Sequence, residues 1–461
     1  MERECIKKLI EWKNSRKRKP LVLMGARQVG KTWLMEEFAK REFGEDYVIV
    51  NFMRHQSLCQ QLKLMDLDPK ALVRLLQTAT GRRIVPGKTL LILDEIQESP
   101  NALTSLKFFY EEMPELAVMA AGSLLGLSYG KDGKGGSAEN GDRGSFPVGK
   151  VDRLNVYPMS FAEFLVANGK KSFVETIDAG DWLSVEALSN EFELLLKTYF
   201  IVGGMPEAVA DWIETGSLAE SRQTQLRILS DYDDDFKKHA PIELLPKIRL
   251  VWQSVPAQLA KENEKFCYGN VRQGARARDY ESALEWLQDA GILYKVHRVC
   301  PPGLPIVRYM SSGAFKVFVH DVGLLCAMSA VDPAIVLEKT ELFTHFKGAL
   351  TEQFVLQEMK TQSIESGYWT PDEGVSEVDF VVQGKTGVYP VEVKAATNTK
   401  AKSLGVYMTA YHPSFAVKTS LRNFSMARDV RSLPLYAFSR WIGGWIFGDS
   451  ASRSDAQKGA R

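Results

Sequence analysis

The sequence predicts an α/β protein with a parallel sheet near its N-terminus, a helical connector and a second α/β domain. Three observations predict this fold class. An apolar strand, a glycine-rich turn and a helix follow one another at residues 21–40. Two helices and an alternating strand fall between residues 248 and 299, and a helix with two acid-bearing strands follows at residues 346–394. The predicted domains are residues 1–168, 169–300 and 301–448. Residues 449–461 have no apolar anchor and are expected to be a disordered tail.

The composition is that of an ordinary globular protein. The chain has 461 residues, of which 45% are hydrophobic and 25% charged, with a formal net charge of +1. At ~150 residues per domain this length accommodates about three domains. The near-zero net charge gives no argument for nucleic acid, so any such contact must come from local clusters. Five scattered cysteines without a CxxC motif argue against a zinc site or a disulfide framework and favour a reducing interior.

Nothing in the sequence indicates a membrane or secretory segment. No run approaches the ~20 apolar residues that a bilayer span requires. Residues 1–19 are polar and basic and do not resemble a cleavable signal. The sequence therefore predicts a cytoplasmic protein that makes no membrane contact.

Residues 25–32 match the phosphate-binding pattern G-x-x-x-x-G-K-[ST]. The apolar run at 21–24 predicts a buried strand, and the spacing of residues 33–40 predicts a helix. In that setting, N–H groups at a helix N-terminus surround a phosphate. Lys31 is expected to act on the β and γ phosphates, and Thr32 to hold magnesium. The predicted ligands are ATP and Mg²⁺, and the predicted nucleotide-binding residues of the loop are Gly25, Ala26, Arg27, Gln28, Val29, Gly30, Lys31 and Thr32.

Two further apolar runs predict the neighbouring strands of the same sheet. The first, residues 89–93, ends in Asp94 and Glu95. Such runs are typical of parallel strands buried on both faces, so these acids should emerge at the carboxyl edge beside the loop. Asp94 is the candidate magnesium ligand and Glu95 the candidate base for the attacking water. The second run, residues 116–121, leads to Ser123, which is predicted to sense the γ-phosphate or simply to form a turn.

These motifs together resemble a prokaryotic branch of AAA+ ATPases in which a C-terminal domain of unknown function follows the ATPase. The resemblance rests on the loop at 25–32, Leu-Asp-Glu-Ile-Gln at 93–97, Ala-Gly-Ser at 121–123 and Val-Tyr-Pro-Met-Ser-Phe-Ala-Glu-Phe at 156–164. It implies ATP hydrolysis and an arginine finger or equivalent from a neighbouring segment or subunit. The candidates are Arg143, Lys150 and Arg153, although lysine lacks the planar fork of arginine.

The pattern from about residue 170 to residue 247 predicts helices, and a glycine-rich stretch precedes them. The glycine-rich stretch at 129–149 has too few apolar residues to pack and is expected to be a mobile loop. The acidic run at 231–235 is expected to be a solvated helix face, because consecutive acids on a helix point in different directions.

Helices predicted at 248–261 and 277–290, followed by a strand at 292–299, have the plan of a winged helix. Arg272, Arg276 and Arg278 would flank its second helix, where phosphate contacts usually lie. A structural lid or packing unit is an equal alternative. Trp252 and Trp286 are predicted to belong to its core.

A second set of reactive side chains lies near the C-terminus. Residues 346–358 predict a helix carrying Glu352, residues 377–382 a strand carrying Asp379, and residues 388–394 a strand carrying Glu392 and Lys394. Residues two apart on a strand share a face. This order resembles the PD-(D/E)xK nuclease superfamily, with Val378 in place of proline.

The chemistry of that site would be magnesium-dependent cleavage of a phosphodiester. Glu352, Asp379 and Glu392 would hold magnesium against a scissile phosphate, and Asp379, Glu392 and Lys394 would form the catalytic set. The alternative is an edge strand whose charged residues face solvent.

The sequence therefore leaves three functional hypotheses. ATP hydrolysis controls a nuclease-like domain that binds and cleaves nucleic acid, with DNA favoured. Alternatively, the chain is a nucleotide-dependent switch whose C-terminal domain is a non-catalytic module for DNA or protein. In the third hypothesis it is an ATPase motor or remodeller. The sequence leaves open whether the chain forms a homo-oligomer or binds a protein partner.

Overall fold

The computed structural model describes residues 1–65, 67–122, 146–261, 265–337, 344–395, 402–427 and 429–448, without the side chains of residues 344–346. Ser123, Arg143, the tail at 449–461 and the predicted loop at 129–149 up to residue 145 lie outside these ranges. Within the described ranges, no helix is both long enough and apolar enough to cross a membrane.

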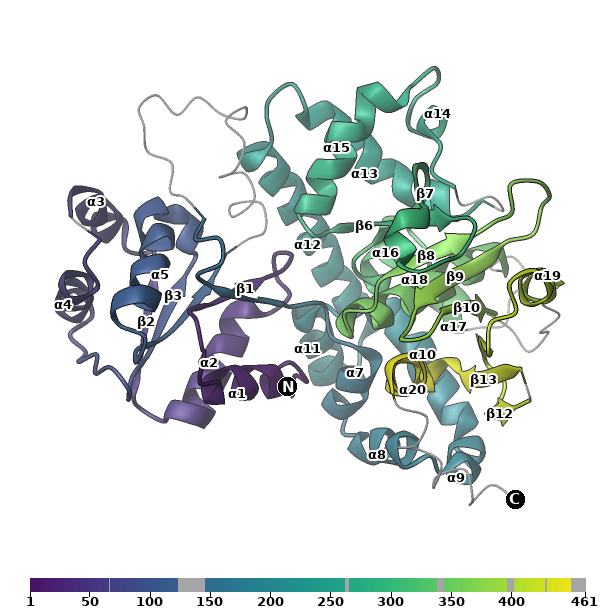
Figure 1. Ribbon diagram of the computed structural model, residues 1–461, viewed down its shortest axis with the longest axis horizontal. Helices are drawn as coiled ribbons and strands as arrows, with labels where there is room; N and C mark the ends of the chain where they lie inside the picture. The colour runs from purple at the N-terminus through teal and green to yellow at the C-terminus, as the bar shows by residue number, and fades with distance from the viewer. Residues whose placement is uncertain are drawn as a thin grey trace.

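The N-terminal part is built on a parallel sheet of five strands in the order β2-β3-β4-β1-β5. Strands β1, β2 and β3 of this sheet are labelled on the left of Figure 1. Strands β3 and β4 are buried along their whole length, as their continuous apolar sequences predict. The strands are β1 (Leu21–Met24), β2 (Tyr47–Asn51), β3 (Leu90–Asp94), β4 (Ala117–Ala121) and β5 (Asp152–Asn155).

Helices cover both faces of this sheet because alternate residues of each strand point to opposite sides. Leu90 and Ile92 pack in the cluster that contains α1 and α2, whereas Leu91 and Leu93 pack in the cluster that contains α3, α4 and α5. The helices are α1 (Ile6–Asn14), α2 (Lys31–Phe43), α3 (Gln56–Leu64), α4 (Pro69–Thr80) and α5 (Pro100–Glu112). This is the mixed α/β arrangement, with a parallel sheet, of P-loop NTPases.

A helical region joins this part to the rest of the chain (Figure 1). It begins after β5 and ends with the 22-residue helix α12. Helices α10 and α12 both pack against α16 (Val322–Met328), so the region shares its core with later segments. Its helices are α7 (Phe161–Ala167), α8 (Lys171–Ala179), α9 (Trp182–Ala187), α10 (Ser189–Val202), α11 (Pro206–Thr215) and α12 (Leu218–His239).

The predicted helix, helix, strand unit is present with bounds close to those expected. Trp252 and Trp286 are 7% and 1% exposed, which confirms their core positions. Strands β6 and β7 pair as an antiparallel hairpin, and β6 also pairs with β8. The elements are α13 (Leu245–Leu259), α14 (Tyr268–Val271), α15 (Ala277–Asp289), β6 (Leu293–Val299) and β7 (Met310–Val319), followed by α16 (Val322–Met328) and α17 (Pro333–Leu337).

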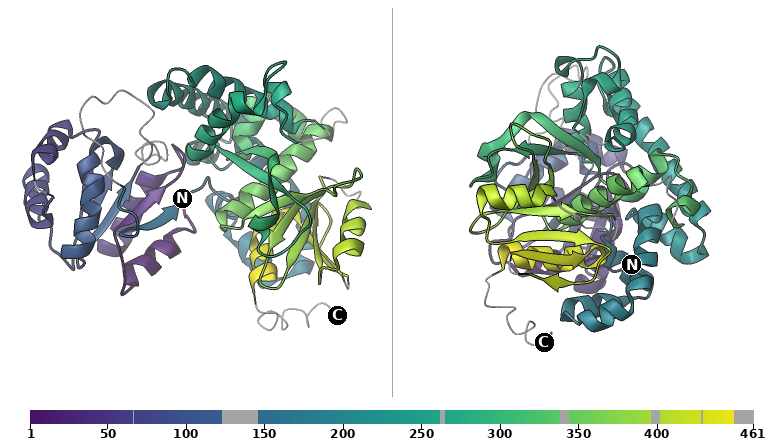
Figure 2. Two further views of the ribbon diagram at one scale, coloured as in Figure 1. Left: turned by 45° about the horizontal axis from the view of Figure 1, so that its top comes forward. Right: turned by 90° about the vertical axis from the view of Figure 1, so that its right-hand side faces the viewer.

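The C-terminal sheet is mixed and has eight strands in the order β12-β13-β11-β10-β9-β8-β6-β7. Figure 2 shows the green and yellow strands of this part of the chain from two further sides. The boundary predicted at residue 300 falls between β6 and β7, so one sheet runs across it. The β6–β7 hairpin crosses this boundary, and backbone hydrogen bonding between β6 and β8 joins the hairpin to the rest of the sheet, a long-range contact that no local pattern reveals. The remaining strands are β8 (Ser366–Trp369), β9 (Val378–Gln383), β10 (Val388–Val393), β11 (Ala416–Ser420), β12 (Ser425–Met426) and β13 (Val430–Pro434).

Helices lie on both faces of this sheet as well. Phe380 and Val391 pack in the cluster that contains α18 (Thr344–Thr361) and α20 (Phe438–Phe447), and Val381 packs with α19 (Lys402–Tyr411). Strand β10 lies between β9 and β11, and all six of its residues are buried. The alternative of a solvent-facing edge strand for these residues is therefore wrong.

Candidate nucleotide site and C-terminal carboxylate cluster

The phosphate-binding loop connects the end of β1 to the start of α2, as predicted. Two of its positions require glycine. A Cβ on Gly25 would lie 2.3 Å from the carbonyl oxygen of Val156, and Gly30 has a φ of 87°, in the left-handed region. Gln28 is also left-handed, with a φ of 64°. The loop is thus held in a tight turn at the N-terminus of α2, where N–H groups and the helix dipole favour a phosphate.

The side chains predicted to hold magnesium meet in the structure. The Thr32 hydroxyl donates to Asp94 Oδ2 at 3.1 Å, and Asn51 Nδ2 donates to the same oxygen at 3.1 Å. The sheet register explains the second contact, because Asn51 is paired with Asp94 across β2 and β3. Hydroxyl and carboxylate oxygens are the donors that Mg²⁺ prefers, so this pair fits the ion.

Lys31 lies beside this pair. Its ammonium donates to the carbonyl oxygens of Gly25 and Ala26, at 2.9 and 2.7 Å. Burial lowers the pKa of Lys31 to about 8, against the opposing effect of Glu95 and Asp94. A phosphate would supply the negative charge that favours the protonated lysine.

The two acids at the end of β3 differ in environment. Asp94 is 3% exposed, and burial together with the charge of Glu95 raises its pKa. Glu95 is left-handed, with a φ of 51°, and its Oε2 accepts a hydrogen bond from Gln97 Nε2 at 2.5 Å. Asp94 therefore contacts Thr32, whereas Glu95 contacts a different partner, Gln97.

Arg3 contacts the loop from outside any predicted motif. Its guanidinium is buried and donates to the carbonyl oxygens of Val29 and Tyr157, at 3.0 and 2.6 Å. It also pairs with Glu163 at 3.1 Å. Glu163 in turn completes a capping box with Ser160 at the start of α7. The 156–164 motif thus supports the phosphate loop through Arg3, which sequence spacing gave no means of finding.

Helix α12 contacts the apex of the phosphate loop. Arg27 pairs with Asp235 at 2.6 Å, Gln28 donates to Asp231 at 2.7 Å, and Tyr232 donates to the Arg27 carbonyl at 3.0 Å. Asp235 is 6% exposed. The prediction that residues 231–235 form a solvated face is therefore wrong for this side of the helix. The acids do point in different directions, and one of those directions is the loop.

Replacing Asp235 by Asn is expected to strengthen ATP binding several-fold, because it removes a buried negative charge beside the phosphate cradle. Isothermal titration of the nucleotide measures the change. Asp234→Asn is the matched control, since Asp234 is exposed and pairs with Lys237 on the same helix. Weaker binding by the Asp235 variant would instead mean that the carboxylate orders the loop for its ligand.

Two of the arginine-finger candidates have partners within this chain. Lys150 pairs with Glu111 at 2.8 Å, and the Arg153 guanidinium lies 4.4 Å from the centroid of the Phe146 ring. The third, Arg143, lies outside the described residues. The finger therefore stays a prediction.

The C-terminal candidate residues lie near one another. Lys394 pairs with Glu392 at 2.7 Å, and Asp379 Oδ2 accepts a hydrogen bond from the Val393 N–H at 2.7 Å. Burial, with the charges of Glu352 and Glu392, raises the pKa of Asp379 well above its ordinary value. Glu392 is 3% exposed, and its Oε2 has no hydrogen-bond partner in the part of the chain that the structure describes.

Lys316 is a member of this cluster that the sequence analysis missed. It lies on β7, is 1% exposed and pairs with Glu377 at 2.7 Å and with Glu352 at 3.2 Å. Among the described residues, no three His, Cys, Asp or Glu side chains are grouped so that they could hold a metal ion, so the magnesium site predicted from Glu352, Asp379 and Glu392 together is not found there. The sequence did contain a signal for Lys316, because a lysine inside the apolar run at 314–319 is expected to be buried and therefore paired.

Three families match separate parts of the chain. The AAA domain family matches residues 17–165. Residues 193–334 match the Domain of unknown function (DUF8612), and residues 347–438 match the Domain of unknown function (DUF4143). A search of curated proteins gave no match.

Two solved structures are similar in part. The Walker-type ATPase PABY2304 of Pyrococcus abyssi has 13% identity and a TM-score of 0.41, over 71% of this chain and 95% of that one. The Aeropyrum pernix ORC1 protein in complex with DNA has 13% identity and a TM-score of 0.27, over 70% and 91%. At these scores neither likeness carries an argument. The AAA domain match and the geometry of the phosphate loop support an AAA-type ATPase function for residues 17–165.

Proposed function

We propose that the chain binds ATP with Mg²⁺ at residues 25–32, hydrolyses it, and uses the cycle to control a nucleic-acid-binding C-terminal domain. The observation that carries the proposal is the contact between Thr32 and Asp94 beside Lys31. Thr32 and Asp94 would hold the ion, which neutralises charge on the phosphates when it is bound. Lys31 would bind the phosphates, and Glu95 would accept a proton from the attacking water.

Contacts between the domains support control of the C-terminal sheet by the nucleotide. Tyr232 donates to the carbonyl oxygen of Arg27 in the loop and lies 3.1 Å from His320 Nε2. His320 follows β7 directly, and β7 carries Lys316 of the carboxylate cluster. A movement of the loop on binding phosphate would therefore act on α12 and on a strand of the C-terminal sheet.

Exposed basic side chains support nucleic acid as the partner, with DNA favoured. Arg272, Arg276 and Arg278 are all exposed near the start of α15. Clustered arginines on one surface bind phosphates and make affinity fall with salt. They place positive charge locally on a chain whose net charge is only +1, with Arg278 also 3.9 Å from the carboxylate of Asp279.

A second candidate function is Mg²⁺-dependent cleavage of nucleic acid by the C-terminal domain, on a fold like that of the PD-(D/E)xK superfamily. The observation that favours it is the buried Oε2 of Glu392 beside Asp379 and Lys394, which has no hydrogen-bond partner among the residues that the structure describes. A buried carboxylate oxygen without a partner is costly, and a bound cation would satisfy it. If cleavage is absent, the domain is a non-catalytic module for DNA or protein.

A paired assay on one preparation tests both candidates. The wild type is expected to hydrolyse ATP only with Mg²⁺, and Lys31→Ala to lose this activity. Cleavage of single- and double-stranded DNA and RNA is measured in parallel. Asp379→Ala is expected to keep ATP hydrolysis and, if the second candidate holds, to abolish nicking. ATP hydrolysis without cleavage of any nucleic acid would contradict the second candidate, the nuclease. Absence of nucleotide binding would contradict the first candidate, the ATP-driven control of the C-terminal domain.

A further inference from the structure

Lys316 is the more deeply buried of the two lysines described above for the C-terminal cluster. The Lys316 ammonium is 2.7 Å from Glu377 Oε1 and 3.2 Å from Glu352 Oε2, and the side chain is 1% exposed. Its ammonium also lies 5.4 Å from the centroid of the Tyr368 ring, a further favourable contact for a cation. A buried ammonium is stable only when it is paired, so these carboxylates and Lys316 depend on one another.

We propose that Lys316 is a built-in counter-ion that occupies the cation position between Glu352 and Glu377, so that a divalent metal binds these two carboxylates only when Lys316 is removed. Carboxylate oxygens bind Mg²⁺ and Ca²⁺ at about 2.0–2.6 Å, so such an ion would need the space that the ammonium fills. A metal ion bound to these two carboxylates would also lie very close to the Lys316 ammonium. Two cations that close together in a site of low dielectric repel each other strongly.

The proposal divides the cluster into two parts. Glu352 and Glu377 share the single positive charge of Lys316, whereas Asp379 and Glu392 lie with Lys394. Glu352 therefore leaves the set of metal ligands that the sequence predicts. The inference rests on the proposed function only in treating this cluster as the functional site of the C-terminal domain.

Mn²⁺ binding to the full-length, nucleotide-free protein tests the proposal. In titrations followed by electron paramagnetic resonance, Lys316→Met is expected to bind one Mn²⁺ more than the wild type. The unfolding temperature of the variant should be lower than that of the wild type without Mn²⁺ and should rise by several degrees with it. The control is Lys316→Met combined with Glu352→Gln and Glu377→Gln. It has the same loss of lysine but no carboxylates at this position, and it should gain no Mn²⁺ site.

Two results would overturn the proposal. One is a Lys316→Met protein that folds but binds no additional Mn²⁺. The other is a wild-type protein that binds Mn²⁺ and loses that binding on Glu352→Gln, a variant that tests the proposal even if Lys316→Met does not fold. A wild type whose Mn²⁺ binding is unchanged by Glu352→Gln supports it. Mn²⁺ binding is measured without nucleotide, so it does not depend on the proposed ATPase function. ATP hydrolysis by the same preparations tests that function separately.

Discussion

Replacing Glu95 by Gln is expected to lower the rate of ATP hydrolysis by about 10²–10⁴-fold while ATP binding is retained. Glutamine has the same shape and can keep the contact with Gln97, but its amide cannot accept a proton from water. Asp94 and Thr32, the predicted Mg²⁺ ligands, are untouched. Steady-state phosphate release measures the rate, and isothermal titration measures nucleotide binding.

The matched control for this variant is Glu98→Gln. Glu98 lies three residues further on, and its side chain is 3.8 Å from Lys238 of α12. It should hydrolyse ATP at nearly the wild-type rate. Lys31→Ala, in contrast, should weaken ATP binding itself, because it removes the charge that acts on the phosphates. Normal hydrolysis by Glu95→Gln would assign the water-activating role to another group.

The parts of the site that the sequence predicted are those that local spacing determines. A strand, turn and helix placed Lys31 and Thr32, and a continuous apolar run placed Asp94 at the edge of the same sheet. The order of acids in residues 346–394 placed Asp379 and Glu392 on paired strands. Each prediction needed only the period of a strand or a helix and the convergence of parallel strands at one edge.

The parts that the sequence could not predict depend on contacts between distant segments. Arg3 meets Glu163 across 160 residues, and Asp235 meets Arg27 across more than 200. Lys316 joins the carboxylates because β7 belongs to the same eight-stranded sheet as β9 and β10. The spacing of residues within a helix or strand, and short motifs, do not show which distant segments lie side by side. For this reason an acidic helix that the sequence predicted to face water instead contacts the phosphate loop.

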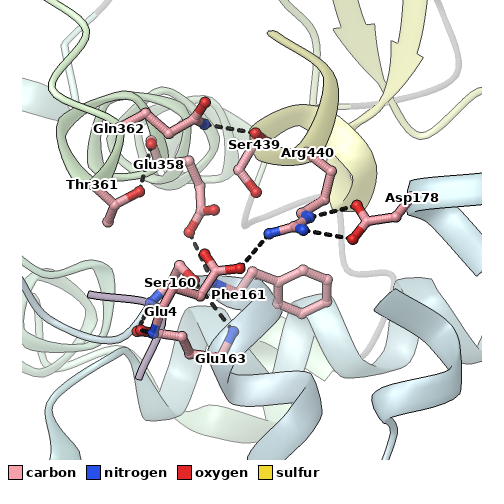
Figure 3. A network of polar contacts seen from close by, with 10 residues as sticks. All are labelled: Glu4, Ser160, Phe161, Glu163, Asp178, Glu358, Thr361, Gln362, Ser439 and Arg440. Atoms are coloured by element: carbon pink, nitrogen blue, oxygen red, sulfur yellow. Dashed lines mark hydrogen bonds and ion pairs between the residues drawn. The ribbon is translucent and has the colours of Figure 1, made fainter. Parts of the chain in front are cut away.

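A further long-range contact connects the two α/β parts through a fully buried acid (Figure 3). Glu358 of α18 is 0% exposed, and its Oε1 accepts a hydrogen bond from the N–H of Phe161, the first residue of α7. Nearby, Arg440 of α20 pairs with Asp178 of α8 at 2.5 Å and with Glu4 near the N-terminus. Segments from both ends of the chain therefore meet at this point.

The protonation state of Glu358 should control the strength of this contact. Burial raises the pKa of Glu358 to about 7 from its ordinary value of 4.5, and the charges of Glu4 and Glu163 act in the same direction. An acid whose pKa is higher in the folded state stabilises that state fully below pH 4.5. This contribution is lost as the pH rises through about 7. Between pH 5 and pH 8 the loss from this group amounts to about 2–3 kcal/mol in the free energy of unfolding.

Replacing Glu358 by Gln is therefore expected to remove about 2–3 kcal/mol of pH dependence between pH 5 and pH 8. The amide oxygen can still accept the Phe161 N–H, so the variant should match the wild type near pH 5 and exceed its stability at pH 8. Urea unfolding at a series of pH values measures this. Glu365→Gln, at an exposed acid that pairs with Lys360, is the control and should leave the slope unchanged.

The comparison between variant and wild type separates Glu358 from the other buried titratable groups. Burial raises the pKa of Asp321 to about 6 and lowers that of His320 to about 4, so both also contribute to the pH dependence of stability. Both are unchanged in Glu358→Gln and cancel in the difference. Equal slopes for the two proteins would show that Glu358 stays in one protonation state over this range. A difference that grows with pH would instead mean that deprotonation weakens the docking of α18 on the start of α7, the helix that follows the last strand of the nucleotide-binding sheet.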